Sequence, residues 1–158
     1  MEKCEFPKSG YIKWNPDACS VCSRCVMACS LYHDGAVSYR LSPIKWLEAN
    51  ALHGFCFRKP LFCQQCNHPE CYYTCPLKDK AMCIDSQTGA RYVNQEQCIG
   101  CGRCLKACPF EVPRIGIDKK KKIAIKCDLC MDHPSGPVCV QLCDRQALTL
   151  VPKEKRFY

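Results

Sequence analysis

Cysteine spacing constrains this chain more than any other feature of its sequence. Nineteen of the 158 residues are cysteines, and sixteen of them form four quartets that each end in C-x3-C. The first and third quartets are C-x2-C-x2-C-x3-C, the second is C-x2-C-x4-C-x3-C, and the fourth is C-x2-C-x8-C-x3-C. In chain order the quartets are Cys19, Cys22, Cys25 and Cys29; Cys63, Cys66, Cys71 and Cys75; Cys98, Cys101, Cys104 and Cys108; Cys127, Cys130, Cys139 and Cys143. The backbone must fold around whatever these side chains bind.

Such a cysteine content is typical of either a disulfide scaffold or a metal protein. The residues from Met1 to Pro7 lack the apolar run of a secretory signal peptide, and disulfides belong to oxidising compartments. Cysteines in repeated C-x-x-C units are also poorly placed to pair with distant partners. Lysine, arginine and proline interrupt every apolar stretch, so no segment predicts a membrane span. We therefore expect a cytoplasmic chain whose thiolates bind metal.

The quartet spacing favours iron–sulfur clusters over zinc. Quartets one and three have the run of bacterial ferredoxins, and Pro109 follows the third quartet as in that run. In that run the last cysteine binds a neighbouring cluster, so clusters come in pairs. Zinc sites typically use two close pairs of ligands separated by a dozen or more residues. The chain is predicted to hold four [4Fe–4S] clusters, each with a complete cysteine set, and no catalytic residue.

The formal charge of +8 at first favours a partner such as nucleic acid. That charge counts every cysteine as neutral, whereas metal ligands are thiolates. Sixteen thiolates, only partly offset by the iron–sulfur cores, bring the loaded protein close to neutrality. The lysines at residues 119–122 are interpreted as a solvated turn, with docking of an acidic partner as the alternative. We expect no nucleic-acid partner.

Between the quartets the sequence predicts short strands and turns. Residues 85–94 predict a turn that leads into a short strand. Residues 112–117 and 123–125 predict a hairpin with a charged tip. Helical turns are expected between the last two cysteines of three quartets, at residues 26–28, 105–107 and 140–142.

The longest stretch with few cysteines runs from residue 30 to residue 62. Residues 44–52 within it have a helix-like pattern. The stretch is interpreted as a loop and a helix that pack over the first cluster, since few other residues can shield it.

These quartets, with C-x4-C in the second and a widened gap in the fourth, resemble the four-cluster ferredoxin-like subunits of molybdenum and tungsten pterin oxidoreductases. The resemblance covers roughly residues 12–151. Residues 28–35 and 42–44 look like those of small subunits paired with tungsten aldehyde oxidoreductase-type enzymes, which include the benzoyl-CoA reductase type. The resemblance implies an α+β fold with two ferredoxin-like cluster-binding halves, short helices, β-hairpins and extensive loops. Residues 1–158 would form one polyferredoxin domain, with residues 12–62 and 118–151 in one half and 63–117 in the other.

In the resembled family the quartets nest, the first with the fourth and the second with the third. Carried onto this chain, the nested ligand sets are Cys19, Cys22, Cys25 and Cys143; Cys127, Cys130, Cys139 and Cys29; Cys63, Cys66, Cys71 and Cys108; Cys98, Cys101, Cys104 and Cys75. Pairing consecutive quartets would satisfy the same spacings, so the sequence leaves both arrangements open. The chain departs from the ferredoxin run where Ser30 and Asp144 stand in place of the proline, which could alter hydrogen bonding to the sulfurs.

Seven further cysteines and histidines lie outside the quartets. The three cysteines are interpreted as buried or incidental thiols, because free cysteine packs as a small hydrophobe. The four histidines show no pair at ligand spacing, so we expect none to complete a cluster. The seven residues are Cys4, Cys56 and Cys83, and His33, His53, His68 and His133.

Complete cysteine sets predict electron transfer rather than catalysis by this chain. The resemblance implies a larger tungsten- or molybdenum-pterin catalytic subunit that oxidises an aldehyde or reduces an acid or acyl-thioester. A flavin, NAD or ferredoxin partner would exchange electrons with the chain, and stacking of copies is compatible with a relay that has two ends. The alternative is a freestanding polyferredoxin that carries electrons between enzymes.

Overall fold

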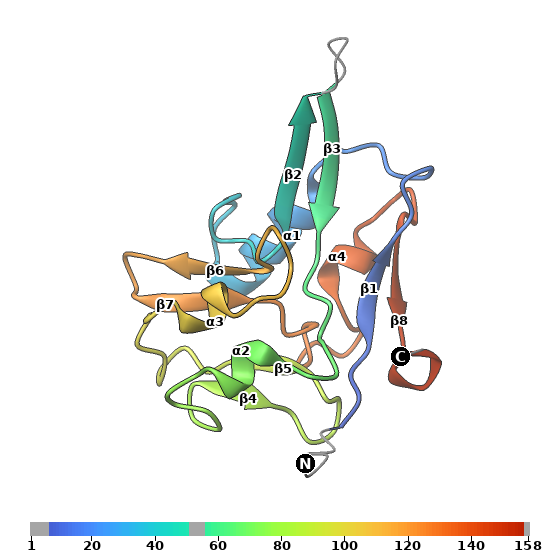
Figure 1. Ribbon diagram of the computed structural model, residues 1–158. Coiled ribbons are helices and arrows are strands. Elements are labelled where there is room, and N and C mark those ends of the chain that lie inside the picture. The colour runs from blue at the N-terminus through green and yellow to red at the C-terminus, as the bar shows by residue number, and fades with distance from the viewer. Residues whose placement is uncertain (1–6, 51–55, 157–158) are drawn as a thin grey trace.

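The computed structural model describes residues 7–50 and 56–156. Its regular structure consists of short elements in an α+β arrangement (Figure 1). The helices are α1 (Arg24–Asp34), α2 (Glu70–Tyr73), α3 (Arg103–Lys106), α4 (Val138–Gln141) and the 3-10 turn η1 (Lys153–Lys155). The strands are β1 (Tyr11–Trp14), β2 (Lys45–Asn50), β3 (Cys56–Leu61), β4 (Met82–Ile84), β5 (Arg91–Val93), β6 (Ile115–Asp118), β7 (Ile123–Lys126) and β8 (Leu148–Val151). Within the described residues, no helix is long and apolar enough to cross a membrane.

In the described part of the chain, the strands form four separate antiparallel pairs. Three pairs are hairpins of neighbouring strands, β2 with β3, β4 with β5, and β6 with β7. The fourth joins the two ends of the described chain, because β1 pairs with β8 from Tyr11 opposite Val151 to Trp14 opposite Leu148. Isolated two-stranded pairs are marginal in water, so these depend on the packing around them.

One predicted hairpin, one predicted turn with the short strand after it, and the helical turns are confirmed by the structure. The turn between β4 and β5 is closed by Asp85, whose Oδ2 accepts hydrogen bonds of 2.6 Å from both the backbone N–H and the hydroxyl of Thr88. Strands β6 and β7 form the hairpin with the lysine-rich tip, and Asp118 Oδ1 accepts a 2.8 Å hydrogen bond from the Lys120 N–H there. Helices α1, α3 and α4 overlap the three expected helical turns.

The predicted helix over residues 44–52 is wrong where the structure describes it. Residues Lys45–Asn50 form strand β2, which pairs along its whole length with β3 and projects beside α1 (Figure 1). Glu48 lies opposite Arg58 and accepts a 2.9 Å hydrogen bond from its Nε. An isolated helix of this length is marginal, and the ladder to β3 satisfies the same backbone groups. Residues 51 and 52 lie outside the described part.

The buried side chains form two clusters. The first joins residues near both ends of the chain and includes Ile12, Val26, Ile44, Phe62 and Leu148. The second comes from the middle of the chain: Tyr72, Met82, Cys104, Ile115 and Ala124. Cysteines belong to both clusters, so the apolar cores and the cysteine sites occupy the same space.

Candidate metal centres

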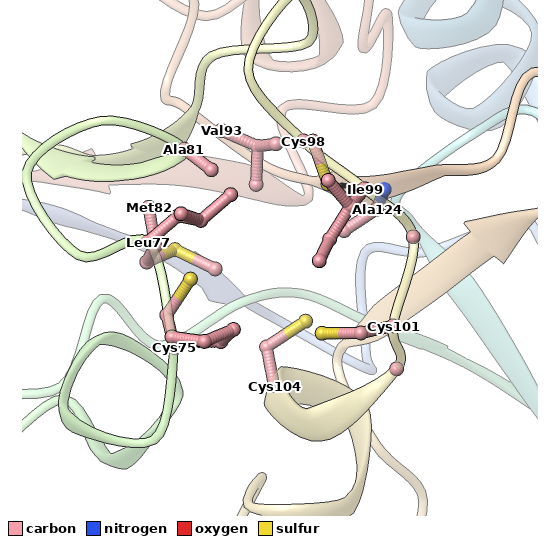
Figure 2. Close-up of a pocket in the computed structure, with 13 residues that line it drawn as sticks. Cys75, Leu77, Ala81, Met82, Val93, Cys98, Ile99, Cys101, Cys104 and Ala124 are labelled. Atoms are coloured by element: carbon pink, nitrogen blue, oxygen red, sulfur yellow. Dashed lines mark hydrogen bonds between the residues drawn. The ribbon is translucent and has the colours of Figure 1, made fainter.

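Three cavities are each lined by four cysteines that come from two quartets. In every case three cysteines open one quartet and the fourth closes another. We name them site 1 (Cys19, Cys22, Cys25 and Cys143), site 3 (Cys63, Cys66, Cys71 and Cys108) and site 4 (Cys75, Cys98, Cys101 and Cys104). Figure 2 shows the labelled cysteine side chains of site 4 pointing toward one another from the loop before β4, from the turn that leads into α3 and from α3 itself.

The four remaining quartet cysteines lie together in the interior. Cys29, Cys130 and Cys139 are buried, with at most 5% of each residue exposed. Burial, and next the neighbouring thiol of Cys130, raises the pKa of Cys29. Burial raises the pKa of Cys127 as well, with Cys29 and Cys139 among its close neighbours. We name this group site 2: Cys29, Cys127, Cys130 and Cys139.

The geometry of the four groups is therefore nested. Sites 1 and 2 combine the first quartet with the fourth, because α1 packs against α4. Sites 3 and 4 combine the second quartet with the third, because α2 packs against α3. The last cysteine of each quartet lies one helical turn beyond the first three, which directs it to the adjacent site.

The backbone reaches these positions through a left-handed residue just before the second cysteine of every quartet. The residues and their φ angles are Val21 (56°), Gln65 (47°), Gly100 (62°) and Leu129 (62°). Only glycine adopts this region without cost, and clustered outliers of this kind mark functional sites. The left-handed turn reverses the backbone direction, so that successive cysteine side chains point toward one common centre. A metal group that binds several thiolates requires this arrangement.

Backbone N–H groups from these and later turns point at the cysteine sulfurs. Donor-to-sulfur distances are 3.3 Å for Ala147 to Cys143 and for Arg114 to Cys108. They are 3.3 Å for Ala124 to Cys98 and 3.4 Å for Leu129 to Cys127, so each of the four sites has such a bond. Hydrogen bonds to thiolate sulfurs stabilise their negative charge and tune the reduction potential of a cluster.

Burial raises the pKa of several of the more buried site cysteines far above the ordinary value of a thiol. The pKa rises to about 12 for Cys29 and Cys104 and to about 11 for Cys25, Cys71 and Cys130. Without a cation the groups would remain neutral thiols at pH 7. A bound iron replaces their protons, so loading of the sites releases protons.

A buried lysine joins sites 2 and 3, which sequence reasoning did not identify. Lys126 Nζ lies 3.3 Å from Cys63 Sγ and donates a 3.1 Å hydrogen bond to the Cys127 carbonyl. Gln65, only 1% exposed, donates from Nε2 to the same carbonyl at 2.7 Å and accepts at Oε1 from the Arg91 N–H at 2.7 Å. The position of Lys126 directly before Cys127 was the only sequence feature that could have indicated this role. A lysine on the protein surface would look the same in the sequence. The cation offsets thiolate charge where two sites meet.

His33 also lies closer to a site than the sequence predicts. Its Nε2 is 3.6 Å from Cys130 Sγ and 3.4 Å from Asp128 Oδ1. The three side chains lie close enough to contact one metal ion. Cys130 already belongs to the complete cysteine set of site 2, so His33 is placed to hydrogen-bond with its sulfur.

Cys83 lies outside the four sites. It is buried, and its Sγ lies 3.4 Å from the carbonyl oxygen of Lys80. This agrees with the interpretation of a packed thiol. Cys4 and the side chain of Cys56 lie outside the described part of the chain.

Four convergent thiols, N–H···S bonds and left-handed turns fit [4Fe–4S] clusters and define an iron–sulfur protein with a ferredoxin-like α+β fold. Residues 55–153 match the family described as 4Fe-4S dicluster domain, so the chain belongs to that family. The residues that would hold the clusters are the cysteines of the four sites.

Named relatives are iron–sulfur proteins. The chain is 38% identical over 137 residues to the aliphatic sulfonate oxidoreductase polyferredoxin-like subunit of Pyrococcus furiosus, covering 84% of this chain and 70% of the relative. It is 32% identical over 141 residues to an uncharacterized ferredoxin of Methanocaldococcus jannaschii, covering 89% and 78%. It is 29% identical over 157 residues to the formate dehydrogenase-O iron-sulfur subunit of Escherichia coli, with 86% of this chain and about half of that subunit covered. Among solved structures, the active site complex BamBC of benzoyl coenzyme A reductase matches with 19% identity and a TM-score of 0.47, covering 90% of this chain and 78% of that one.

Proposed function

We propose that this chain is an electron-transfer subunit that relays electrons through four [4Fe–4S] clusters to or from a tungsten- or molybdenum-pterin catalytic subunit. One observation carries the proposal: all sixteen quartet cysteines lie in four groups of four, so every proposed cluster has a complete thiolate set. A complete set leaves no iron open for a substrate. The remaining chemistry is the uptake and release of electrons.

Contacts between neighbouring sites support a linear relay. Burial and nearby cysteines raise the pKa of Cys139, and these neighbours include Cys25 of site 1. After burial, the largest influence on Cys127 of site 2 is Cys63 of site 3. After burial, the largest influence on Cys104 of site 4 is Cys71 of site 3. We therefore propose the order site 1, site 2, site 3, site 4 for the relay, with Lys126 contacting cysteines of both inner sites.

Lys126 is placed to balance the potentials of the two inner clusters. It lies between sites 2 and 3, and a nearby positive charge raises the reduction potential of a cluster. A relay needs inner clusters that accept electrons without a steep barrier. We propose that this buried cation serves that purpose.

A permanent larger partner is supported by exposed apolar side chains on α1 and in the loop after it. They are Leu31, Tyr32, Val37 and Tyr39, each between 42% and 60% exposed. A group of large apolar side chains of this kind is what a stable interface covers. The sulfonate oxidoreductase and formate dehydrogenase relatives are named as subunits, which also supports this assignment. We propose an aldehyde oxidoreductase-type enzyme as the partner, in an anaerobic cytoplasm.

The single domain would contain two halves, residues 12–62 with 118–151 and residues 63–117. The two buried clusters support this division, because one draws mainly on the chain ends and the other on the middle. The alternative function is a freestanding polyferredoxin. Cys22 of site 1 and Cys101 of site 4 are both exposed, which favours exchange of electrons at both ends of the relay.

Metal analysis of the native protein tests the proposal. The protein is purified without oxygen from its host, every co-purifying chain is kept, and iron, labile sulfide, zinc, tungsten and molybdenum are measured. About sixteen irons per chain, with tungsten or molybdenum on a larger companion, is the expected result. The same iron content without a companion would favour the freestanding carrier. Stoichiometric zinc with little iron would overturn both functions.

A further inference from the structure

Five exposed basic residues lie on the segments that line site 4 or pack against it. Two lie on α3, which begins two residues after Cys101. Two lie between Leu77 and Ala81, both of which line the site 4 cavity. The fifth belongs to the β6–β7 turn, whose backbone lies against Gly100. We name this group the basic rim: Arg103, Lys106, Lys78, Lys80 and Lys122, all of them exposed.

The charge of the basic rim faces solvent. Across residues 7–50 and 56–156, none of its five side chains forms an ion pair with an acidic residue. Acidic residues also lie nearby in sequence, and besides Asp79 and Glu96 they include Glu111 and Asp118. Asp79 accepts a 2.6 Å hydrogen bond from the Tyr72 hydroxyl, and Glu96 is exposed before the third quartet. Basic residues still outnumber acidic residues on these segments.

An apolar contact lies within this positive surface. Ile99 is 61% exposed and lines the site 4 cavity together with Cys101, which is itself exposed. Protein interfaces commonly have an apolar centre and a polar or charged rim. Small interfaces are typical of transient electron-transfer complexes. The charged residues around the apolar centre orient an approaching partner protein and increase its association rate.

The opposite end of the relay has a different surface. At site 1 the basic residue before the third cysteine, Arg24, is paired with Asp144. Trp46 and Pro60 of the β2–β3 hairpin also line that cavity. Arg145 is a further exposed basic residue in the lining of site 1, so site 1 is partly covered by the hairpin and has fewer basic residues around it than site 4.

We propose that the basic rim and Ile99 form the docking surface for a small acidic redox protein, which exchanges electrons with the cluster of site 4. The inference rests on the proposed electron-transfer function and adds the partner and the point of entry. In each encounter one electron leaves the reduced cluster of the acidic protein, which is oxidised, and reduces the cluster of site 4. No bond is formed or broken and no proton is required.

Stopped-flow absorbance under anaerobic conditions tests the proposal, with a dithionite-reduced acidic two-cluster ferredoxin as the probe. The iron-loaded protein is compared with the double variant Arg103→Glu/Lys106→Glu. The control, Lys13→Glu/Lys155→Glu, has the same change of charge on exposed residues of β1 and η1, away from α3 (Figure 1). Iron content and reduction by dithionite alone are measured for all three proteins.

We expect the rim variant to accept electrons at least about tenfold more slowly than the control at low salt, because steering by charge contributes this much or more to association rates. Salt should slow the unaltered protein and the control but have little effect on the rim variant. Equal rates in variant and control, no salt dependence, or no reduction of the unaltered protein by ferredoxin would each overturn the docking surface. Failure of the unaltered protein to hold iron or to be reduced by dithionite would overturn the proposed function instead.

Discussion

The first and third quartets have the same cysteine spacing but different residues between the cysteines. Left-handed backbone flanks the second cysteine in both, supplied by Val21 and Ser23 in the first and by Gly100 and Gly102 in the third. A Cβ on Gly100 would lie 2.4 Å from the Lys122 carbonyl oxygen. The comparison shows that the turn requires a left-handed conformation, while glycine is required only where another segment of the chain approaches.

The two quartets also differ after their last cysteine. Helix α3 ends at Lys106, before Cys108, so Pro109 lies outside the helix. Helix α1 continues past Cys29 to Asp34, which places Ser30 in a helix interior where proline is excluded. The Ser30 hydroxyl donates to the Met27 carbonyl at 3.0 Å and accepts from the Ser38 N–H at 2.9 Å. Loss of the ferredoxin proline therefore accompanies a longer helix that anchors the next loop.

Removal of one ligand from either quartet should have the largest effect. Cys22→Ser and Cys101→Ser each break a set of four thiols, so each should lose or convert one cluster, about four of about sixteen irons. Iron and sulfide analysis, with electron paramagnetic resonance of the reduced protein, measures the loss. Cys83→Ser is the matched control and should keep its full iron content. Equal loss in all three variants would refute the proposed ligand sets.

Substitution of the residue that follows the last cysteine of the first or third quartet should have the next largest effect, measured as the free energy of unfolding. Ser30→Pro should lower the free energy of unfolding by about 3 kcal/mol or more, since proline disrupts a helix interior. Pro109→Ser should cost only about 0.4–1 kcal/mol, through the greater freedom of the unfolded chain. Anaerobic denaturant unfolding of the iron-loaded proteins, followed by circular dichroism, compares them. Similar losses would show that the extent of α1 does not explain the missing proline.

Alanine substitutions at Gly100 and Gly102 distinguish the cost of a steric clash from the cost of a left-handed backbone. Gly100→Ala should cost about 1–3 kcal/mol, because it adds a clash with Lys122 to the left-handed strain. Gly102→Ala has no atom within 4 Å of the new Cβ and should cost about 1 kcal/mol from strain alone. The same unfolding measurement provides the difference. A Gly102 variant as unstable as the Gly100 variant would mean that the approach of Lys122 is unimportant.

The smallest effect is expected at the arginine that both quartets place before their third cysteine. Arg24 is paired with Asp144, yet both side chains are at least half exposed. Exposed pairs contribute little to stability. Arg24→Ala and Arg103→Ala should therefore both unfold within experimental error of the unaltered protein. A clear loss for Arg24→Ala alone would show that its pair with Asp144 holds site 1 together.

Local pattern was sufficient for much of the fold. The turn before β5, the β6–β7 hairpin and the helices within three of the quartets depend on turn residues and spacing over a dozen residues or fewer, which the sequence displays directly. The helix expected over residues 44–52 failed for the opposite reason. The partner strand β3 lies beyond the segment, and its ladder outweighed the local preference.

The sequence by itself determined the four quartets, their fitness for [4Fe–4S] clusters and the short elements between the ligands. It left open which quartets meet, because nested and consecutive pairing have the same local spacing. Only the tertiary structure decided that α1 packs on α4 and α2 on α3, and that Lys126 reaches Cys63 across 63 residues of sequence. Contacts between distant segments depend on the packing of the whole chain, and no local spacing encodes them.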